Sequence, residues 1–448
     1  MLPAILALPL LLPAAAAPQQ SSEDGRGQGF FDARWHAARR QALMGRVKEG
    51  VIVLRGAGEA DDYREFRQDN NFWYFTGLTT PGAVLVLVPE SGRQVLFVPP
   101  ANPSAEMWLG DLIDPEEAAA LTGIEDCRSL SAGGRSWGGL DELLSELGQE
   151  HDTFLVQVQP GENWMMSRDN LQAAARARAG DLFDGRKGRG EQLKAVLEER
   201  YGAEVKDITV MLDAMRVIKT PEEIQAMRRA CEISGEAHIA AMKRTEPGLY
   251  EWQLAAAMTG VMLEQGAMGP AYAAIVGSGP NSCVLHYNTN TRRLEKGDVV
   301  MIDYGAEFNH YVADISRSWP VGKKFSKRQR EVYEAVYASQ EAAFAQCKPG
   351  SNIMRVQQAA ANELRKRGFP GQPPHGVSHW LGMATHDVGN VMAAFEPGMV
   401  LTVEPGVYLP DEGIGIRLED VVAITEDGYE LLSDSVPRDL PDIERLRK

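Results

Sequence analysis

Residues 299–320 read VVMIDYGAEFNHYVADISRSWP, and this stretch decides how the last third of the chain folds. The apolar run VVMI ends at Asp303 and the run YVA ends at Asp314. Both runs are typical of buried β-strands. We expect a hairpin that turns at Phe308-Asn309 and places Asp303 directly opposite Asp314, with Cβ atoms roughly 4.5–5.5 Å apart. Because a carboxylate among buried apolar residues is costly unless it is paired or bound to a metal, the two aspartates favour a metal site.

Three further polar residues lie in strand-like apolar sequence. Glu404 follows VLTV (400–403), Glu419 lies in IRLEDVVAI (416–424), and His379 lies in SHWLG. Each residue alone could form a salt bridge or lie at the surface. Together with the two aspartates they predict a site for two divalent cations, which sit about 3.5–4 Å apart in hydrolytic centres. Four carboxylates and one imidazole suit Mn²⁺, and also Co²⁺ or Zn²⁺, better than thiolate-seeking metals.

Ordered sequence blocks run through most of the chain outside the first thirty residues and roughly 120–210. The blocks are EFRQDNNFWYFTG (65–77), RVIKTPEEIQAMRRA (216–230), PAYAAIVGSGPNSCVLHY (270–287), MIDYGAE (301–307), YVADISRSWP (311–320), HGVSHWLGMATHDVG (375–389), PGMVLTVEPGVY (397–408) and GIRLEDVVAIT (415–425). In these blocks the chain resembles aminopeptidase P, the Xaa-Pro aminopeptidase of a metallopeptidase family that also includes prolidase and creatinase. The resemblance assigns the same five metal ligands.

Two folded domains are expected. Strand-like segments such as GVIVLRG (50–56) and AVLVLVP (83–89) alternate with helical stretches and predict an N-terminal α/β domain over 30–205. The resemblance implies an α+β catalytic domain of the pita-bread fold over 206–448. A long helix should begin after Thr220, which serves as N-cap with Pro221 at the first helical position.

The resemblance also implies which residues surround the metals. His286, His375 and His386 match histidines that line the active site, where they would orient substrate or donate hydrogen bonds to the tetrahedral intermediate. Tyr408 and Arg417 match positions beside the glutamate ligands, where they would contact the substrate. The remaining histidines of this half, His238 and His310, are expected to be structural.

The implied activity is that of a metallo-exopeptidase that removes the residue preceding a proline at position two of a peptide. A hydroxide held between two metal ions would attack the scissile carbonyl, and Glu404 would carry the proton to the prolyl nitrogen. The alternatives are a prolidase, which cleaves Xaa-Pro dipeptides, and a metal-free amidinohydrolase or binding protein of the same fold. The insert NVMAAFE (390–396) carries no Arg or Lys for a dipeptide carboxylate, which favours the aminopeptidase.

Trp108, in AEMWLGD, matches a tryptophan that in the family approaches the active site, often from a neighbouring subunit. The match implies a homo-oligomer, a dimer or tetramer, with Trp108 near the substrate. Asp111 and Leu112 depart from the basic pair that follows this tryptophan in the family.

The N-terminus predicts export. Residues 1–17 carry no charged side chain and end in small residues, as in a secretory signal peptide, and residues 18–29 resemble a flexible linker. A periplasmic or secreted protein is therefore expected, and otherwise a cytoplasmic one, without a membrane span. The net charge of −16 has no basic block to offset it, which argues against nucleic-acid binding. The cysteines are expected to be free thiols, namely Cys127, Cys231, Cys283 and Cys347.

Overall fold

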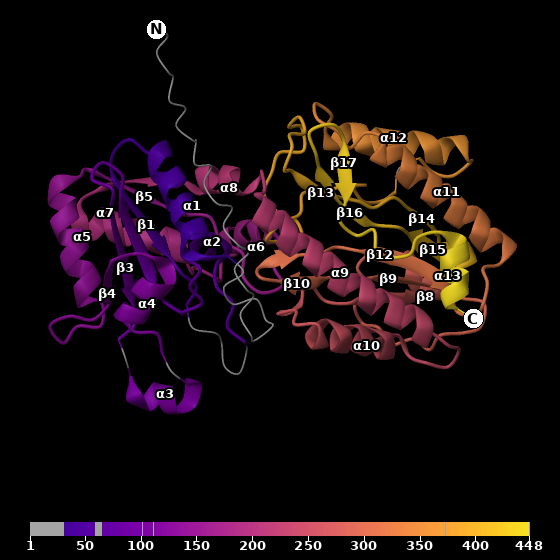
Figure 1. Cartoon of the computed structure of the whole chain (residues 1–448), viewed down its shortest axis with the longest axis horizontal. Helices are drawn as coiled ribbons and strands as arrows, with labels where there is room; N and C mark the ends of the chain where they lie inside the picture. The colour runs from indigo at the N-terminus through magenta and orange to yellow at the C-terminus, as the bar shows by residue number, and fades with distance from the viewer. Residues whose placement is uncertain (1–30, 59–64, 101, 111, 372, 448) are drawn as a thin grey trace, which may run out of the picture.

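The computed structural model describes residues 31–58, 65–100, 102–110, 112–371 and 373–447. The predicted signal peptide and linker lie outside the described residues. Two domains lie side by side along the long axis of the molecule, with the C-terminus on the second (Figure 1). Among the described residues, none of the helices has the length and apolar character needed to cross a membrane.

A six-stranded mixed sheet forms the centre of the N-terminal domain, in the order β4-β3-β2-β1-β5-β6. Its strands are β1 (Val51–Arg55), β2 (Val84–Val88), β3 (Arg93–Val98), β4 (Asp126–Ser129), β5 (Thr153–Val156) and β6 (Glu204–Asp207). The helices packed on its two faces are α1 (Ala33–Arg46), α2 (Asn70–Thr76) and α4 (Pro115–Thr122) on one, and α5 (Gly138–Glu150) and α7 (Arg189–Tyr201) on the other.

The central strands β1, β2 and β5 are buried on both faces, which explains why they are apolar, whereas the edge strands β4 and β6 are polar and more exposed. In β1, Ile52 and Leu54 pack with α1 and α2, whereas Val51 and Val53 pack with α5 and α7. Side chains that alternate between two buried faces require apolar residues at every position. β6 pairs in parallel with β5, so this sheet extends two residues beyond position 205.

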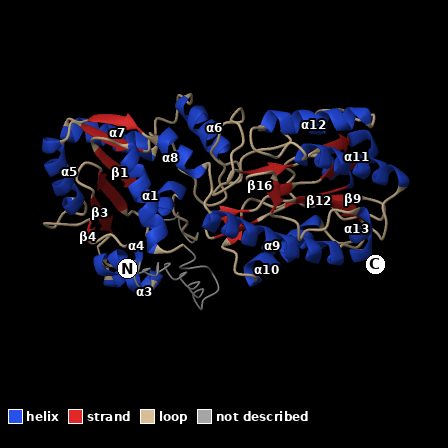
Figure 2. Cartoon of the chain, turned by 45° about the horizontal axis from the view of Figure 1, so that its top comes forward, coloured by secondary structure: helices blue, strands red, loops and turns tan. Residues whose placement is uncertain are grey.

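The first half of the chain also contains the helices α3, α6 and α8. α3 (Pro103–Leu109) lies apart from the rest of the domain (Figure 1). α6 (Arg168–Ala179) and α8 (Thr209–Arg216) lie towards the junction with the second domain (Figures 1 and 2).

Four small antiparallel sheets form the centre of the second domain. They are β7 (Gly269–Pro270) with β10 (Ala306–Phe308) and β11 (Tyr311–Val312); β8 (Ile275–Ser278) with β9 (Val299–Asp303) and β12 (Ser316–Pro320); β13 (Val400–Val403) with β16 (Asp420–Ile424) and β17 (Tyr429–Leu431); and β14 (Gly406–Leu409) with β15 (Ile414–Arg417). The helices outside them are α9 (Pro221–Arg244), α10 (Glu251–Glu264), α11 (Lys327–Phe344), α12 (Ile353–Lys366) and α13 (Leu440–Leu446). In Figure 2 these helices enclose the strands from both sides. The α+β architecture predicted for this half is confirmed.

The long helix α9 begins as the sequence predicts. Thr220 Oγ1 accepts a hydrogen bond from the main-chain N–H of Glu223, and the Glu223 carboxylate accepts from the N–H of Thr220. This reciprocal pair satisfies amides that the first helical turn leaves without partners.

The hairpin of residues 299–320 forms, but its predicted register is wrong. Phe308 pairs with Tyr311, so the turn is Asn309-His310, and Asp303 lies opposite Ser316 instead of Asp314. Both turn residues have positive φ, 49° and 66°, as a two-residue type I′ turn requires. The shift is two positions, so Asp314 stays on the same face as Asp303 and becomes its diagonal neighbour.

All four cysteines are free thiols, as expected.

Candidate metal centre

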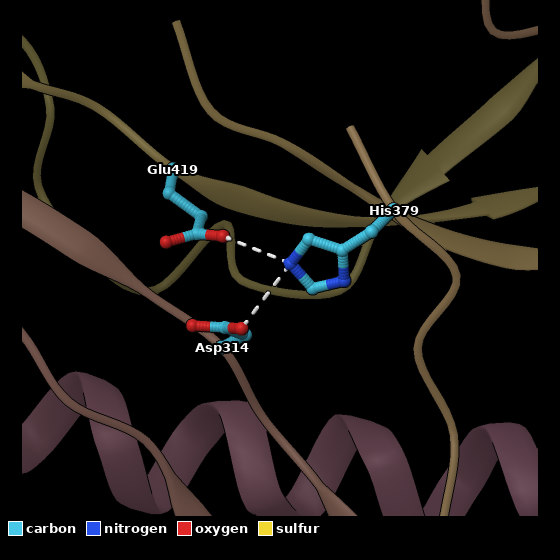
Figure 3. Close-up of side chains that lie close together, drawn as sticks. All are labelled: Asp314, His379 and Glu419. Carbon is cyan, nitrogen blue, oxygen red and sulfur yellow. Dashed lines mark ion pairs between the residues drawn. The ribbon is translucent and has the colours of Figure 1, made fainter. Parts of the chain in front are cut away.

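Three of the predicted ligands come from distant segments and meet at one point. Asp314, His379 and Glu419 each direct one ligand atom into a space where these atoms lie within 4.8 Å of one another (Figure 3). His379 Nε2 lies 3.4 Å from Asp314 Oδ2, 3.8 Å from Glu419 Oε1 and 3.6 Å from Glu404 Oε1. Ligands that each stand about 2.0–2.2 Å from a metal ion are separated from one another by roughly 3–4 Å. The spacing therefore fits ligands around a shared cation.

Asp303 joins the group through a tyrosine. The Tyr272 hydroxyl lies 2.6 Å from Asp303 Oδ1 and 2.6 Å from Asp314 Oδ1. Since a phenol carries one hydrogen, it can donate to only one of these carboxylates at a time. The structure thus gathers all five predicted ligands, with the two aspartates diagonally across the hairpin.

Main-chain hydrogen bonds hold the histidine and glutamate segments together. The Thr402 N–H donates to the carbonyl of His379 (2.9 Å), and the Glu404 N–H donates to the carbonyl of Val377 (2.8 Å). The segment before Trp380 therefore runs beside the end of β13. Glu404 and His379 reach the same cavity for this reason.

A buried chain of hydrogen bonds orients the remaining glutamate. Ser316 Oγ donates to Glu419 Oε2 (2.8 Å), and Arg417 Nε donates to Ser316 Oγ (2.8 Å). Arg417 Nη2 also donates to Asp303 Oδ2 at 2.5 Å, and Nη1 donates to the Tyr408 hydroxyl at 3.3 Å. Arg417, which itself lines the cavity, therefore holds predicted ligand side chains in place.

Without bound cations, the carboxyl groups of this cluster have raised pKa values. Burial raises the pKa of Asp314, and the nearby Asp303 carboxylate raises it further. Burial also raises the pKa values of Glu404 and Glu419, helped by the negative charge of neighbouring carboxylates. Two divalent cations would supply four positive charges to four carboxylates, so the donor set fits such a pair and would release protons on binding it.

A cavity of about 480 Å³ opens over the ligands. The predicted residues His286, His375 and His386 line it. Its apolar walls are formed by Ile275 and Leu285 from the catalytic domain and by Met165 and Met166 from the N-terminal half. A chamber of this kind, with polar groups converging on one floor and apolar walls, is typical of a small-molecule or peptide site.

His375 is held in a neutral form. Its Nδ1 lies 2.7 Å from the Gly376 carbonyl and its Nε2 lies 2.8 Å from the Tyr408 hydroxyl. Burial, reinforced by the positive charge of Arg417, lowers the pKa of His375 to about 4. Nδ1 therefore donates to the carbonyl, and Nε2 accepts from the tyrosine.

His386 lies directly beside His379, the predicted histidine ligand, and the centroids of the two rings are 4.3 Å apart. Burial and the neighbouring His379 lower the pKa of His386, while Asp169 acts in the opposite direction. Asp169 Oδ2 lies 2.8 Å from His386 Nδ1.

Three other residues named from the sequence lie elsewhere. Trp108 is 85% exposed on α3 and does not line the cavity, so within one chain the structure does not bring it to the site. His238 is buried with Nε2 at 3.0 Å from the Tyr304 carbonyl, and His310 stacks on Trp73 with ring centroids 4.2 Å apart. Both histidines are buried away from the cavity, as expected for residues with a structural role.

The sequence did not predict the contacts that Tyr272, Ser316 and Asp169 make with residues of the site. Ser316 could have been found from the hairpin register, since it stands opposite Asp303. The other two come from segments with no acidic or histidine pattern of their own. Only the folded chain shows their contacts with the ligand residues.

The sequence matches two family models. Residues 36–154 match the aminopeptidase P N-terminal domain, and residues 225–426 match metallopeptidase family M24. The chain is 35% identical to an Escherichia coli Xaa-Pro aminopeptidase over 91% of its own length and 96% of that protein. A Pyrococcus furiosus Xaa-Pro dipeptidase is 36% identical over 51% of the chain and 67% of its own length. A solved structure of E. coli aminopeptidase P superposes with a TM-score of 0.78 at 31% identity, covering 93% of this chain and 98% of that one.

An N-terminal α/β domain followed by an α+β domain with a cage of acids and one histidine defines a two-domain metallopeptidase of the pita-bread fold. The chain belongs to metallopeptidase family M24, in its aminopeptidase P branch. It is a metal-dependent aminopeptidase, which confirms the exopeptidase activity expected from the sequence.

Proposed function

We propose that this aminopeptidase uses two metal ions and removes the N-terminal residue from peptides with proline at position two. The observation that carries the proposal is the convergence of Asp303, Asp314, His379, Glu404 and Glu419 beneath one cavity. The names of the E. coli and Haemophilus influenzae relatives, both Xaa-Pro aminopeptidases, support the proline preference.

The oxygen-rich donor set favours Mn²⁺, with Zn²⁺ or Co²⁺ as alternatives. Two such ions, when bound, supply a water of lowered pKa and polarise the scissile carbonyl. The Glu404 carboxyl lines the cavity, 3.6 Å from His379 and 3.5 Å from His375. A carboxylate at this position would take up a proton and deliver it to the prolyl nitrogen.

The cavity's histidines would position the peptide. His286 is exposed at the wall and has space to donate to the carbonyl oxygen as negative charge develops there. His386 faces the same space beside His379. The prolyl nitrogen has no N–H, so recognition would depend on the ring's shape against apolar walls.

A partner subunit would complete the site. Trp108 and Met107 are 85% and 84% exposed on the separate helix α3, which is unusual for side chains of this size. We propose a homo-oligomer in which α3 of one subunit approaches the cavity of another.

Cleavage of dipeptides is the second candidate, because the relatives also include Xaa-Pro dipeptidases. The loop 390–396 offers no cation for a dipeptide's carboxylate, which favours longer substrates. Hydrolysis of Ala-Pro and Ala-Pro-Ala by the Mn²⁺-loaded protein distinguishes the two. Preference for Ala-Pro-Ala supports the aminopeptidase, preference for Ala-Pro supports the prolidase, and cleavage of Ala-Ala-Ala at an equal rate refutes proline selection.

A further inference from the structure

A short segment of the N-terminal half enters the catalytic cavity. Met165, Met166, Asp169 and Asn170 all line the space above the metal ligands. The segment leads into α6, which lies between the two domains (Figures 1 and 2). One wall of the catalytic site is therefore built by residues outside the catalytic domain.

Arg168 anchors this segment. Its side chain is only 6% exposed, and its Nη1 donates to the Pro160 carbonyl (2.8 Å) and lies 3.2 Å from Glu162. Its Nη2 donates to the carboxylate of Asp213. A buried guanidinium with this many partners has little freedom to move, so the residue that follows it has a fixed position.

Two contacts from adjacent residues hold His386. The main-chain N–H of Arg168 donates to the carbonyl of His386 at 2.9 Å, and Asp169 Oδ2 lies 2.8 Å from His386 Nδ1. The next residue, Asp387, is held by the catalytic domain and α8. Its carboxylate accepts hydrogen bonds from Arg216 Nη2 at 2.5 Å and from the main-chain N–H of Met383 at 3.2 Å. Both the main chain and the ring of His386 are thus restrained.

We propose that Asp169 is a positioning residue for His386, which it holds with Nδ1 turned away from the metals and Nε2 available to the substrate. An ionised carboxylate only accepts hydrogen bonds, so Nδ1 must carry the hydrogen of this pair. The contact therefore selects one ring orientation and one tautomer of the neutral histidine. The N-terminal domain takes part in the reaction through this contact. The inference rests on the proposed function, since it concerns the same cavity.

Activity tests the proposal through matched variants of the metal-loaded protein. Removing a partner that orients an active-site histidine typically costs about 10–100-fold, so Asp169→Ala should lower kcat on Ala-Pro-Ala by at least about tenfold. Asp169→Asn keeps an acceptor at the same place and should restore most of that loss. Asp181→Ala is the control, because Asp181 is exposed and, among the residues that the structure describes, forms hydrogen bonds only with Phe183 and its local turn. Metal content should be equal in all four proteins.

A second readout does not depend on turnover. Long-range ¹H–¹⁵N spectra of protein labelled in histidine, with His386 assigned by His386→Gln, should show the hydrogen on Nδ1 in the wild type and a shift towards Nε2 in Asp169→Ala. The proposal is overturned if Nε2 carries the hydrogen in the wild type, or if Asp169→Ala keeps wild-type kcat. Loss of metal from Asp169→Ala would also overturn it. If the wild type does not cleave Ala-Pro-Ala, the proposed function is refuted, and the spectra alone then test whether Asp169 orients His386.

Discussion

Replacing Arg216 by methionine should destabilise the junction between the domains more than any surface charge change. Arg216 is buried, with 1% of its side chain exposed. It donates to Glu162 Oε2 at 3.0 Å, to Asn71 Oδ1 at 2.9 Å and to Asp387 Oδ1 at 2.5 Å. Methionine fills much of the same volume but leaves the two buried carboxylates without this cation.

The size of the effect follows from what remains around those carboxylates. Removal of one partner from a buried ion pair costs about 3–5 kcal/mol, because the other charge stays buried. Here Glu162 keeps Arg168 at 3.2 Å, and Asp387 keeps Lys219 at 3.7 Å. The two losses therefore do not add in full, and we expect the free energy of unfolding to fall by about 3 kcal/mol.

Urea unfolding followed by tryptophan fluorescence and circular dichroism measures this change. The control is Arg93→Met, because Arg93 pairs with Glu146 at 2.8 Å while their side chains are 32% and 51% exposed. An exposed pair contributes about 0–1 kcal/mol. If Arg216→Met cost no more than Arg93→Met, the buried network would not stabilise the junction, and our reasoning would be refuted.

Four further predictions concern the metal centre and the residues that would approach it. Burial and like charges raise the pKa values of Asp314, Glu404 and Glu419, so these groups bind more protons in the metal-free native state than in the unfolded chain. Stability should therefore decrease as pH rises above the ordinary carboxyl range. Thermal melts in chelator from about pH 7 to pH 9, where buried histidines such as His375 are neutral in both states, test this, and a stability that rises over that window would contradict it. Metal affinity should change the other way and weaken as pH falls, which calorimetry at several pH values can measure. Glu404→Gln should lower kcat by about 100-fold or more as a lost proton carrier while the fold stays intact by circular dichroism, and near-normal turnover would exclude that role. Trp108→Ala should reduce kcat/KM on Ala-Pro-Ala without changing the stability of the isolated chain, and an unchanged kcat/KM would remove Trp108 from the site.

Local sequence patterns predicted the helices and strands of this fold, because the spacing of apolar residues reflects which side chains are buried. The apolar runs before Asp303 and Asp314 became β9 and β11, and the Thr220-Pro221 signal marked the start of α9. The register between the two runs could not be read in the same way. The register depended on which two residues adopt positive φ at the turn. Asn309 favours that conformation, but His310, which shares it, gives no such signal in the sequence.

The convergence of the five predicted ligands could be anticipated from the sequence, whereas the residues that hold them in place could not. A carboxylate within apolar sequence is conspicuous by its chemistry, whereas Tyr272 and Asp169 have ordinary surroundings in the sequence. Asp169 and His386 are 217 positions apart, and no local period connects them. Such pairs become visible only after the two domains have packed.

The metal content of the purified protein shows whether the five converging side chains hold two cations. Protein is dialysed against Mn²⁺, and in parallel against Zn²⁺ and Co²⁺, and its metal content is measured by inductively coupled plasma mass spectrometry. The His379→Ala variant is prepared and measured in the same way. We expect two ions per wild-type chain with at least one of these metals, and fewer than two in the variant. A wild type that retains one ion or none with all three metals, or a variant that retains as many as the wild type, would contradict it.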